Sequence, residues 1–292
     1  MPEKPDIKLI ECPRDAMQGL SDFIPTELKA EYINKLLKVG YNTIDFGSFV
    51  SPQAVPQMRD TADVLSKLNL DNSKTELLAI IANLKGAQQA AQFDEVKYLG
   101  FPFSISDTFQ RRNVNATIIQ SLGRVEDITV IHEICKKFNK KMVIYISMGF
   151  GNPYGDPWSI DFLNHYIYIL KNIDIDIIAL SDTVGISDPK DVEKVFSNLI
   201  PQYPTIEFGA HFHTTPDKWE EKISAAYKGG CRRFDGAIKG FGGCPLSGYH
   251  LVGNMPTENI INFLDENQVN TGINKEALWE AMAFASKVFP HD

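Results

Sequence analysis

Short apolar runs alternate with stretches of helical periodicity along the whole chain. Eight runs of five to eight residues, rich in β-branched side chains, predict buried strands. These runs are residues 7–11, 42–46, 76–82, 96–101, 142–147, 175–180, 206–213 and 233–238. Between them, apolar residues recur every three or four positions, as in a helix that buries one face. Residues 26–39 are the clearest case, because Ile33 and Leu37 share a face and Gly40 can end the helix.

The same periodicity predicts a helix after nearly every strand. The further helices are expected at about 58–68, just after Asn83, 117–138 with a break near Gly123, 160–173, 190–199, 219–228, 257–267 and 274–289. This alternation predicts a (β/α)8 TIM barrel with an additional C-terminal helix at about 274–289. A doubly wound open sheet is the alternative. No composition break divides the chain, so we expect one catalytic domain over residues 1–292.

Polar side chains gather where the predicted strands end. The set comprises Arg14, Asp15, Asp45, Asn83, Ser147, Asp182, His211 and His213. Catalytic residues of barrel enzymes lie at the C-terminal ends of the strands. The placement of these residues therefore predicts an active site at that face of the barrel.

His211 and His213 form an H-x-H pair at the end of the seventh predicted strand. Side chains on a strand alternate between faces, so both imidazoles point the same way and can hold one ion. Two unrelated histidines are the alternative reading of this short motif. Asp15, at the end of the first strand, is the natural carboxylate partner because strand one of a barrel lies near strand seven. Such a nitrogen and oxygen donor set suits Mg²⁺, Mn²⁺ or Zn²⁺.

A glycine-rich loop follows the eighth predicted strand and carries Cys244. We expect a lid at about 239–254, because glycines allow a loop to close over substrate and open again. At the tip of such a loop, Cys244 can deliver or take a proton. A buried, inert thiol is the alternative.

Composition excludes several classes of protein. The net charge of −8 and the absence of long Lys/Arg runs argue against a nucleic-acid-binding face. No apolar stretch approaches a membrane span, and the first residues contain no signal core. The four cysteines are widely spaced and form no C-x-x-C pattern, which predicts a reduced, cytoplasmic protein.

Several motifs together resemble one family, the 3-hydroxy-3-methylglutaryl-CoA lyases of the metal-dependent TIM-barrel lyase/synthase superfamily. The similarity runs over nearly the whole chain. Its marks are P-R-D-A-M-Q at 13–18, S-F-V-S-P at 48–52, N-L-K-G at 83–86, D-T-V-G at 182–185, the histidine pair, G-G-C-P at 242–245 and G-N-M-P-T-E at 253–258. The histidine pair is shared by the superfamily, whereas G-G-C-P and S-F-V-S-P indicate the lyase branch.

The resemblance implies roles for individual residues. It assigns Asp15, His211, His213 and Asn254 to a divalent ion, and Arg14 to the enolate oxygen of the thioester. Cys244, with His211, would protonate the enolate, while Asp45 and Asp182 would order the site. Expected contacts with the substrate come from Arg14, Gln18, Asn83 and Ser147. Arg111 and Arg112 could meet the phosphates of CoA, although a solvated basic patch is an equal alternative.

The implied reaction is retro-Claisen cleavage of 3-hydroxy-3-methylglutaryl-CoA to acetoacetate and acetyl-CoA, typical of leucine breakdown. The family further implies a homodimer. A synthase that joins acetyl-CoA to a 2-oxo acid is the runner-up, and a non-catalytic metal-binding barrel is the third reading. Three departures from the family pattern put the acyl group in doubt: Asp45 replaces a Glu, Ala16 a Gly, and Lys239 a small residue before the lid.

Overall fold

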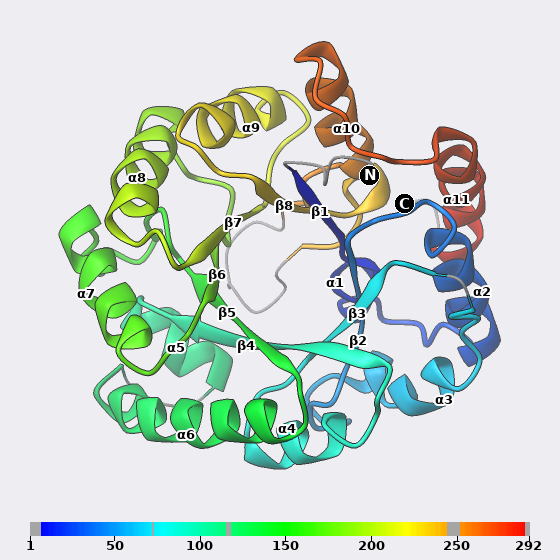
Figure 1. Ribbon diagram of the computed structural model, residues 1–292, viewed down its shortest axis with the longest axis horizontal. Helices are drawn as coiled ribbons and strands as arrows, with labels where there is room; N and C mark the ends of the chain where they lie inside the picture. Colours follow the sequence, from blue (N-terminus) through cyan, green and yellow to red (C-terminus); the bar gives the residue numbers. More distant parts are fainter. Residues whose placement is uncertain (1–6, 72, 115–117, 244–251, 290–292) are drawn as a thin grey trace.

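A computed structural model describes residues 7–71, 73–114, 118–243 and 252–289. Eight parallel strands pair in chain order and close into a barrel, with helices packed around its outside (Figure 1). The closed barrel confirms the predicted TIM-barrel fold and excludes an open doubly wound sheet. The strands are β1 (Lys8–Glu11), β2 (Thr43–Ser48), β3 (Glu76–Ile80), β4 (Val96–Ser104), β5 (Lys141–Ser147), β6 (Ile177–Asp182), β7 (Glu207–Phe212) and β8 (Arg233–Gly236).

The helices follow the predicted alternation, with differences at three places. They are α1 (Pro13–Gln18), α2 (Thr26–Leu36), α3 (Thr61–Leu65), α4 (Leu84–Ala90), α5 (Asp107–Val114), α6 (Ile118–Lys137), α7 (Ile160–Lys171), α8 (Pro189–Gln202), α9 (Trp219–Lys228), α10 (Thr257–Glu266) and α11 (Lys275–Val288), with 3-10 turns η1 (Pro56–Met58) and η2 (Ile238–Gly240).

The first difference is α1, where no helix was expected. Its six residues are too few to show periodicity, although Pro13 in its first turn suits a helix start. The second is α5, where no helix was expected. There the Ser106 hydroxyl accepts a hydrogen bond from Phe109 N, and Asp107 pairs with Arg111 one turn later. The third is α6, which continues through Gly123 without the expected break.

The barrel closes by pairing its first strand with its last. Lys8 aligns with Arg233 and Glu11 with Gly236, while His211 of β7 aligns with Asp235 of β8. Residues from the two ends of the chain therefore share one side of the barrel. This closure brings β1, β7 and β8 together at the site described below.

Side-chain caps begin several helices at their predicted positions. Asn83 accepts from Gly86 N at α4, Ser159 from Phe162 N at α7, and Asn274 from Ala277 N at α11. The additional helix α11 packs against α2, where Tyr32 stacks on Phe284. The C-terminal helix is thus part of the outer layer of the barrel.

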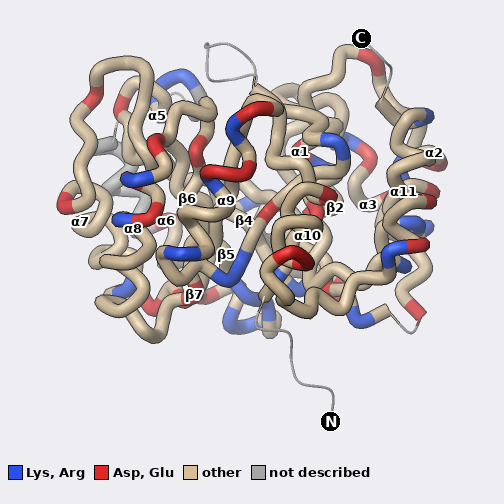
Figure 2. Tube along the Cα trace, turned by 90° about the horizontal axis from the view of Figure 1, so that it is seen from above, with Lys and Arg blue, Asp and Glu red and all other residues tan. Residues whose placement is uncertain are grey.

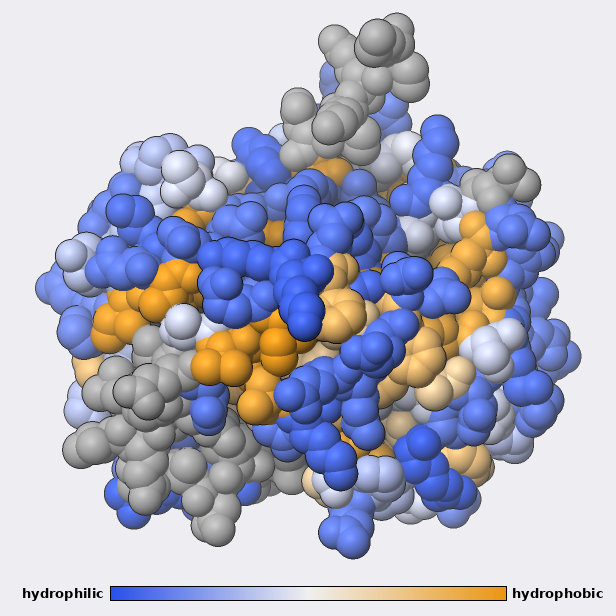
Figure 3. All heavy atoms as spheres, turned by 60° about the horizontal axis from the view of Figure 1, so that its bottom comes forward, coloured by the Kyte–Doolittle hydropathy of each residue, from blue (hydrophilic) through white to orange (hydrophobic). Residues whose placement is uncertain are grey.

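Charged residues of both signs are interspersed over the outside of the barrel (Figure 2). On the face shown in Figure 3, hydrophobic residues form patches separated by hydrophilic ones. Within the described part of the chain, no helix combines the length and the apolar character that crossing a membrane requires.

Candidate active site

The short helix α1 places two charged side chains inside the mouth of the barrel. Arg14 and Asp15 are both buried, and Arg14 Nη1 donates to Asp15 Oδ1 at 2.9 Å. Gln18, one turn later, accepts from Arg14 Nη1 at 2.8 Å and donates to Asp15 Oδ1 at 3.2 Å. The helix therefore presents one preformed Arg–Asp–Gln group rather than a solvated pair of charges.

Asp45, in the middle of β2, holds the other side of the Arg14 guanidinium. Its Oδ2 accepts from Arg14 Nε at 3.0 Å and from Nη2 at 2.5 Å, whereas its buried Oδ1 has no hydrogen-bond partner among the described residues. Burial raises the pKa of Asp45 to about 6, although the charge of Arg14 and its hydrogen bonds lower it. Asp45 thus fixes the orientation of the guanidinium.

The two histidines of β7 are held through their Nδ1 atoms. His211 Nδ1 lies 3.2 Å from Asp235 Oδ2, and His213 Nδ1 lies 3.1 Å from the carbonyl oxygen of Val252. With Nδ1 directed at an acceptor, Nε2 of each ring is left for an ion. The ring centroids are 5.5 Å apart, and Tyr145 packs edge-on against His211. Both rings are therefore fixed in position.

Asp15 and the two histidines form a set of donors that could hold a metal ion. One ligand atom from each of the three lies within 4.8 Å of the others. Asn254 adjoins them: its Nδ2 donates to Asp15 Oδ2 at 2.9 Å and to the Phe241 carbonyl at 2.8 Å. With its Nδ2 engaged, Asn254 has its amide oxygen left as a ligand. Two imidazoles, one carboxylate and one amide oxygen fit a divalent cation.

The charges around this set adjust its pKa values. Burial alone would raise the pKa of Asp15, but Arg14 and the two imidazoles hold it below the usual value. Burial would lower the pKa of His211, yet the bond to Asp235 raises it above normal. The pKa of His213 is lowered, first by burial and then by the neighbouring His211. The anionic Asp15 and a neutral His213 are the forms that bind metal.

A family model described as HMGL-like matches residues 7–284. The chain belongs to the HMGL-like family. It is 30% identical over 287 residues to the cytoplasmic 3-hydroxy-3-methylglutaryl-CoA lyase of Rattus norvegicus, covering 96% of this chain and 80% of the relative. It is also 30% identical over 280 residues to the hydroxymethylglutaryl-CoA lyase YngG of Bacillus subtilis, covering 96% and 91%.

Solved structures agree with the family assignment. An HMG-CoA lyase from Acinetobacter baumannii, in complex with coenzyme A and 3-methylmalate, superposes with a TM-score of 0.89. It is 30% identical, and the match covers 100% of this chain and 94% of that one. The resemblance stated from the sequence motifs is thus confirmed at the level of family and fold.

Asp182 of this HMGL-like chain lies at the end of β6 with both carboxylate oxygens engaged. Its Oδ2 accepts from the buried Lys222 Nζ at 2.7 Å and from Ser187 Oγ at 2.6 Å, and its Oδ1 accepts from Ile186 N. Lys222 also donates to the carbonyl of His213 at 3.1 Å. Asp182 is therefore linked through Lys222 to the end of β7, beside the two histidines.

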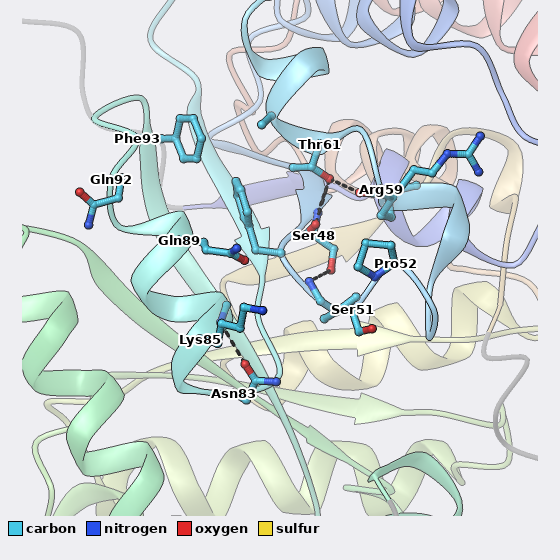
Figure 4. A pocket seen from close by; sticks show the side chains of 15 residues that line it. Ser48, Ser51, Pro52, Arg59, Thr61, Asn83, Lys85, Gln89, Gln92 and Phe93 are labelled. Atoms are coloured by element: carbon cyan, nitrogen blue, oxygen red, sulfur yellow. Dashed lines mark hydrogen bonds between the residues drawn. The ribbon is translucent and has the colours of Figure 1, made fainter.

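A cavity of about 540 Å³ opens beside β2 and β3 of the HMGL-like barrel. Figure 4 shows its amide and cationic side chains, among them Asn83, Lys85 and Gln89. The stacked rings of Phe49 and Phe93, with centroids 5.3 Å apart, belong to its apolar wall. Asn83, which was expected to contact substrate, lines this cavity while capping α4. This mixture of apolar and amide groups is typical of a small-molecule site.

The remaining predicted residues are Ser147, Arg111, Arg112 and Cys244. Ser147 is half-buried at the end of β5. Arg111 is exposed and paired with Asp107, and Arg112 lies over the ring of Tyr154 at 4.7 Å. Cys244 falls outside the described residues, so its predicted role stays a prediction.

Lys239, the departure from the family pattern ahead of the glycine-rich loop, is engaged on the outside of the barrel. Its Nζ donates to the hydroxyl of Ser286 in α11 at 3.0 Å. Its φ of +57° places it in the left-handed region, which few non-glycine residues adopt. Lys239 therefore joins the segment after β8 to the C-terminal helix.

Sequence reasoning missed three buried charged residues that support this site. Asp235 orients His211, Lys222 joins Asp182 to His213, and Glu11 binds residues on both sides of the segment that contains Asn254. The signal for Asp235 was its position inside a predicted buried strand, where a carboxylate needs a partner. Lys222 looked like part of the solvated face of α9.

Proposed function

We propose that this protein is a divalent-metal-dependent carbon–carbon lyase that cleaves 3-hydroxy-3-methylglutaryl-CoA to acetoacetate and acetyl-CoA. The observation that carries the proposal is the convergence of Asp15, His211 and His213 within 4.8 Å beside a fixed Arg14. The relatives named above are lyases of this type. Asp15, His211, His213 and Asn254 would hold Mg²⁺ or Mn²⁺, whose positive charge would acidify and orient the tertiary hydroxyl.

The geometry of Arg14 suits it to a developing enolate. A guanidinium has five N–H donors, and the described contacts of Arg14 with Asp15, Gln18 and Asp45 use four of them. The remaining N–H is on Nη2. Directed at the thioester oxygen, it would stabilise the negative charge that forms there as the C2–C3 bond breaks. Asp45 and Gln18 hold the group in place before substrate binds.

Proton transfers complete the reaction. A base near the ion removes the hydroxyl proton, and Asp15, whose pKa is held low, is ionised and available at neutral pH. The electron pair of the C2–C3 bond then moves into the thioester enolate, and an acid protonates C2 to give acetyl-CoA. Because His211 Nδ1 is engaged by Asp235, only Nε2 is left for the ion, and one nitrogen cannot both bind metal and donate a proton. We therefore assign this proton to Cys244.

The cavity beside β2 and β3 is our proposed site for the amide-containing arm of the thioester, with the Lys85 ammonium near the phosphates. Lys85→Met should raise KM for the CoA thioester about tenfold, and should leave KM for the matching pantetheine thioester, which lacks the nucleotide, unchanged. Arg111→Met is the matched control. If Arg111→Met raised KM and Lys85→Met did not, the phosphate site would instead be assigned to α5, which carries Arg111.

The decisive experiment is an assay of metal-stripped protein with 3-hydroxy-3-methylglutaryl-CoA. Acetoacetate should appear only when Mg²⁺ or Mn²⁺ is restored, and Cys244→Ala should abolish most of it. No acetoacetate with either ion would reject the lyase proposal. Thiol release from acetyl-CoA in the presence of 2-oxo acids would then indicate the synthase reaction instead. A cytoplasmic location, a homodimer and a role in leucine breakdown stay predictions.

A further inference from the structure

Glu11 is a buried carboxyl group that the proposed reaction does not use. It is the last residue of β1 and has no exposed surface. Its Oε1 accepts from Ile238 N at 2.9 Å, and its Oε2 accepts from the Thr257 hydroxyl at 2.5 Å. Burying a carboxyl group is costly unless it is well bonded, so this placement calls for an explanation.

The two partners of Glu11 lie on either side of one segment. Ile238 precedes residues 239–256, and Thr257 follows them as the first residue of α10. The two sides also pair through their backbones, since Ala237 N donates to Met255 O at 3.0 Å and Thr257 N to Ala237 O at 3.2 Å. Glu11 therefore ties both sides of this segment to the first strand.

This segment supplies the ligand candidate Asn254. The amide of Asn254 bridges the Phe241 carbonyl and Asp15 Oδ2. The fit is tight: a Cβ on Gly242 would lie 2.6 Å from the Ala16 Cα and 2.8 Å from Asn254 Nδ2. A small shift of the segment would therefore move Asn254 away from Asp15. Asp15 follows Glu11 closely in the sequence. Glu11 is therefore hydrogen-bonded to both sides of the segment that contains Asn254 and linked by a short stretch of backbone to Asp15.

We propose that Glu11 is a positioning residue that fixes Asn254 against Asp15 and so sets the geometry of the divalent-ion site. This inference rests on the metal site of the proposed function. It does not depend on which acyl-CoA is cleaved.

The bonding pattern specifies which substitutions preserve the function of Glu11. A glutamine can accept from Ile238 N through its oxygen and donate to the Thr257 hydroxyl through its nitrogen. An alanine satisfies neither group. If Glu11 acted only through its charge, Glu11→Gln and Glu11→Ala would lose its effect to the same extent.

The test measures Mn²⁺ binding to metal-stripped protein by the loss of the free-ion electron paramagnetic resonance signal, with no acyl-CoA present. Glu11→Ala should weaken binding about tenfold, as removal of outer-shell partners typically does. Thr257→Val should weaken it less, and Glu11→Gln should bind like the parent. Asp60→Ala is the matched control, because it removes another buried carboxylate, one bonded to Lys29 and Thr26.

A double-variant cycle separates positioning from general destabilisation. In an Asn254→Ala background, Glu11→Ala should cause little further loss of Mn²⁺ affinity, because its effect acts through Asn254. Additive losses, or an equal loss in Asp60→Ala, would overturn the inference. If Glu11→Ala does not yield folded protein, unchanged affinity in Thr257→Val or a tenfold loss in Glu11→Gln would overturn it as well.

The result is distinguishable from that of the proposed function. Mn²⁺ binding that depends on Glu11 through Asn254, without cleavage of 3-hydroxy-3-methylglutaryl-CoA, would reject the lyase reaction and keep this inference. Metal-dependent cleavage, with an Mn²⁺ affinity that does not change when Glu11 is replaced, would keep the lyase reaction and reject this inference.

Discussion

Asn254 Nδ2 lies 2.9 Å from Asp15 Oδ2, although 239 positions of sequence separate the two residues. The contact exists because β1 pairs with β8 when the barrel closes. It unites a carboxylate from the beginning of the chain with an amide from near its end. The H-x-H motif supplies two donors of the candidate set, and barrel closure brings Asp15 and Asn254 to them.

Removing the charge of Asp235 should weaken metal binding. In Asp235→Asn the acceptor for His211 Nδ1 becomes neutral or is replaced by an N–H, so the ring loses the partner that fixes its tautomer. We expect Mn²⁺ affinity to fall about tenfold, measured by calorimetry on the purified protein. Asp156→Asn, which alters a carboxylate bonded to Ser106 and Thr108, is the control. Equal affinities in both variants would contradict the role of Asp235.

Replacing Arg14 should slow the chemical step more than it weakens binding of substrate. Arg14→Gln removes the N–H that we assign to the enolate oxygen, and loss of one such donor costs about 10²–10³ in kcat. Steady-state assays with saturating Mg²⁺ measure kcat and KM separately. Arg232→Gln, which alters an exposed arginine over the ring of Tyr227, should change kcat little. A rise in KM with kcat intact would assign Arg14 to binding instead.

The free energy of unfolding should depend on the protonation of Glu11. Burial raises its pKa from 4.5 to about 8, so between these values the folded protein keeps a proton that the unfolded chain releases. Stability contributed by this group is therefore present below pH 4.5 and is lost as the pH rises toward 8, by about 5 kcal/mol at most.

Urea titrations of the parent and of Glu11→Gln at several pH values would isolate this contribution. The difference between the two proteins should grow with pH across the window, because glutamine does not titrate. Other groups near Glu11 are Glu258, Tyr41 and Tyr32; burial keeps the pKa of each tyrosine well above 10, so neither titrates here. A difference that is constant with pH would show that Glu11 is ionised throughout.

Breaking the Lys222–Asp182 pair should destabilise the fold. Lys222→Met leaves a buried carboxylate with one charged partner fewer, a change that typically costs about 3–5 kcal/mol. Adding Asp182→Asn to the same protein should recover part of that loss, because the unpaired charge is then removed. Denaturant midpoints of the single and double variants provide the measurement. A loss below about 1 kcal/mol would mean that the pair contributes little.

The sequence alone was sufficient to predict the fold and the principal residues of the candidate site. Strand ends could be located from apolar runs, and a barrel topology brings those ends to one face. Asp15, His211, His213 and Asn254 were all named from the chain alone, and the structure places them together. Their roles as ligands stay predictions until an ion is bound.

The supporting residues could not be found in this way, because their meaning depends on packing. Asp235 and Glu11 are carboxylates in otherwise buried strands, and only three-dimensional contacts identify their partners. Lys222 lies on an amphipathic helix where lysine normally faces water, yet it is fully buried. The helix α5 was missed because its polar sequence carries no periodic apolar face.

The pairing of β1 with β8 also sets an order of events during synthesis of the chain. Arg14, Asp15 and Asp45 leave the ribosome early, long before Asn254 is made. The nascent chain can therefore fold its first βα units while lacking a complete ion site. The candidate ion site is completed only when roughly the last fifth of the chain emerges and the barrel closes.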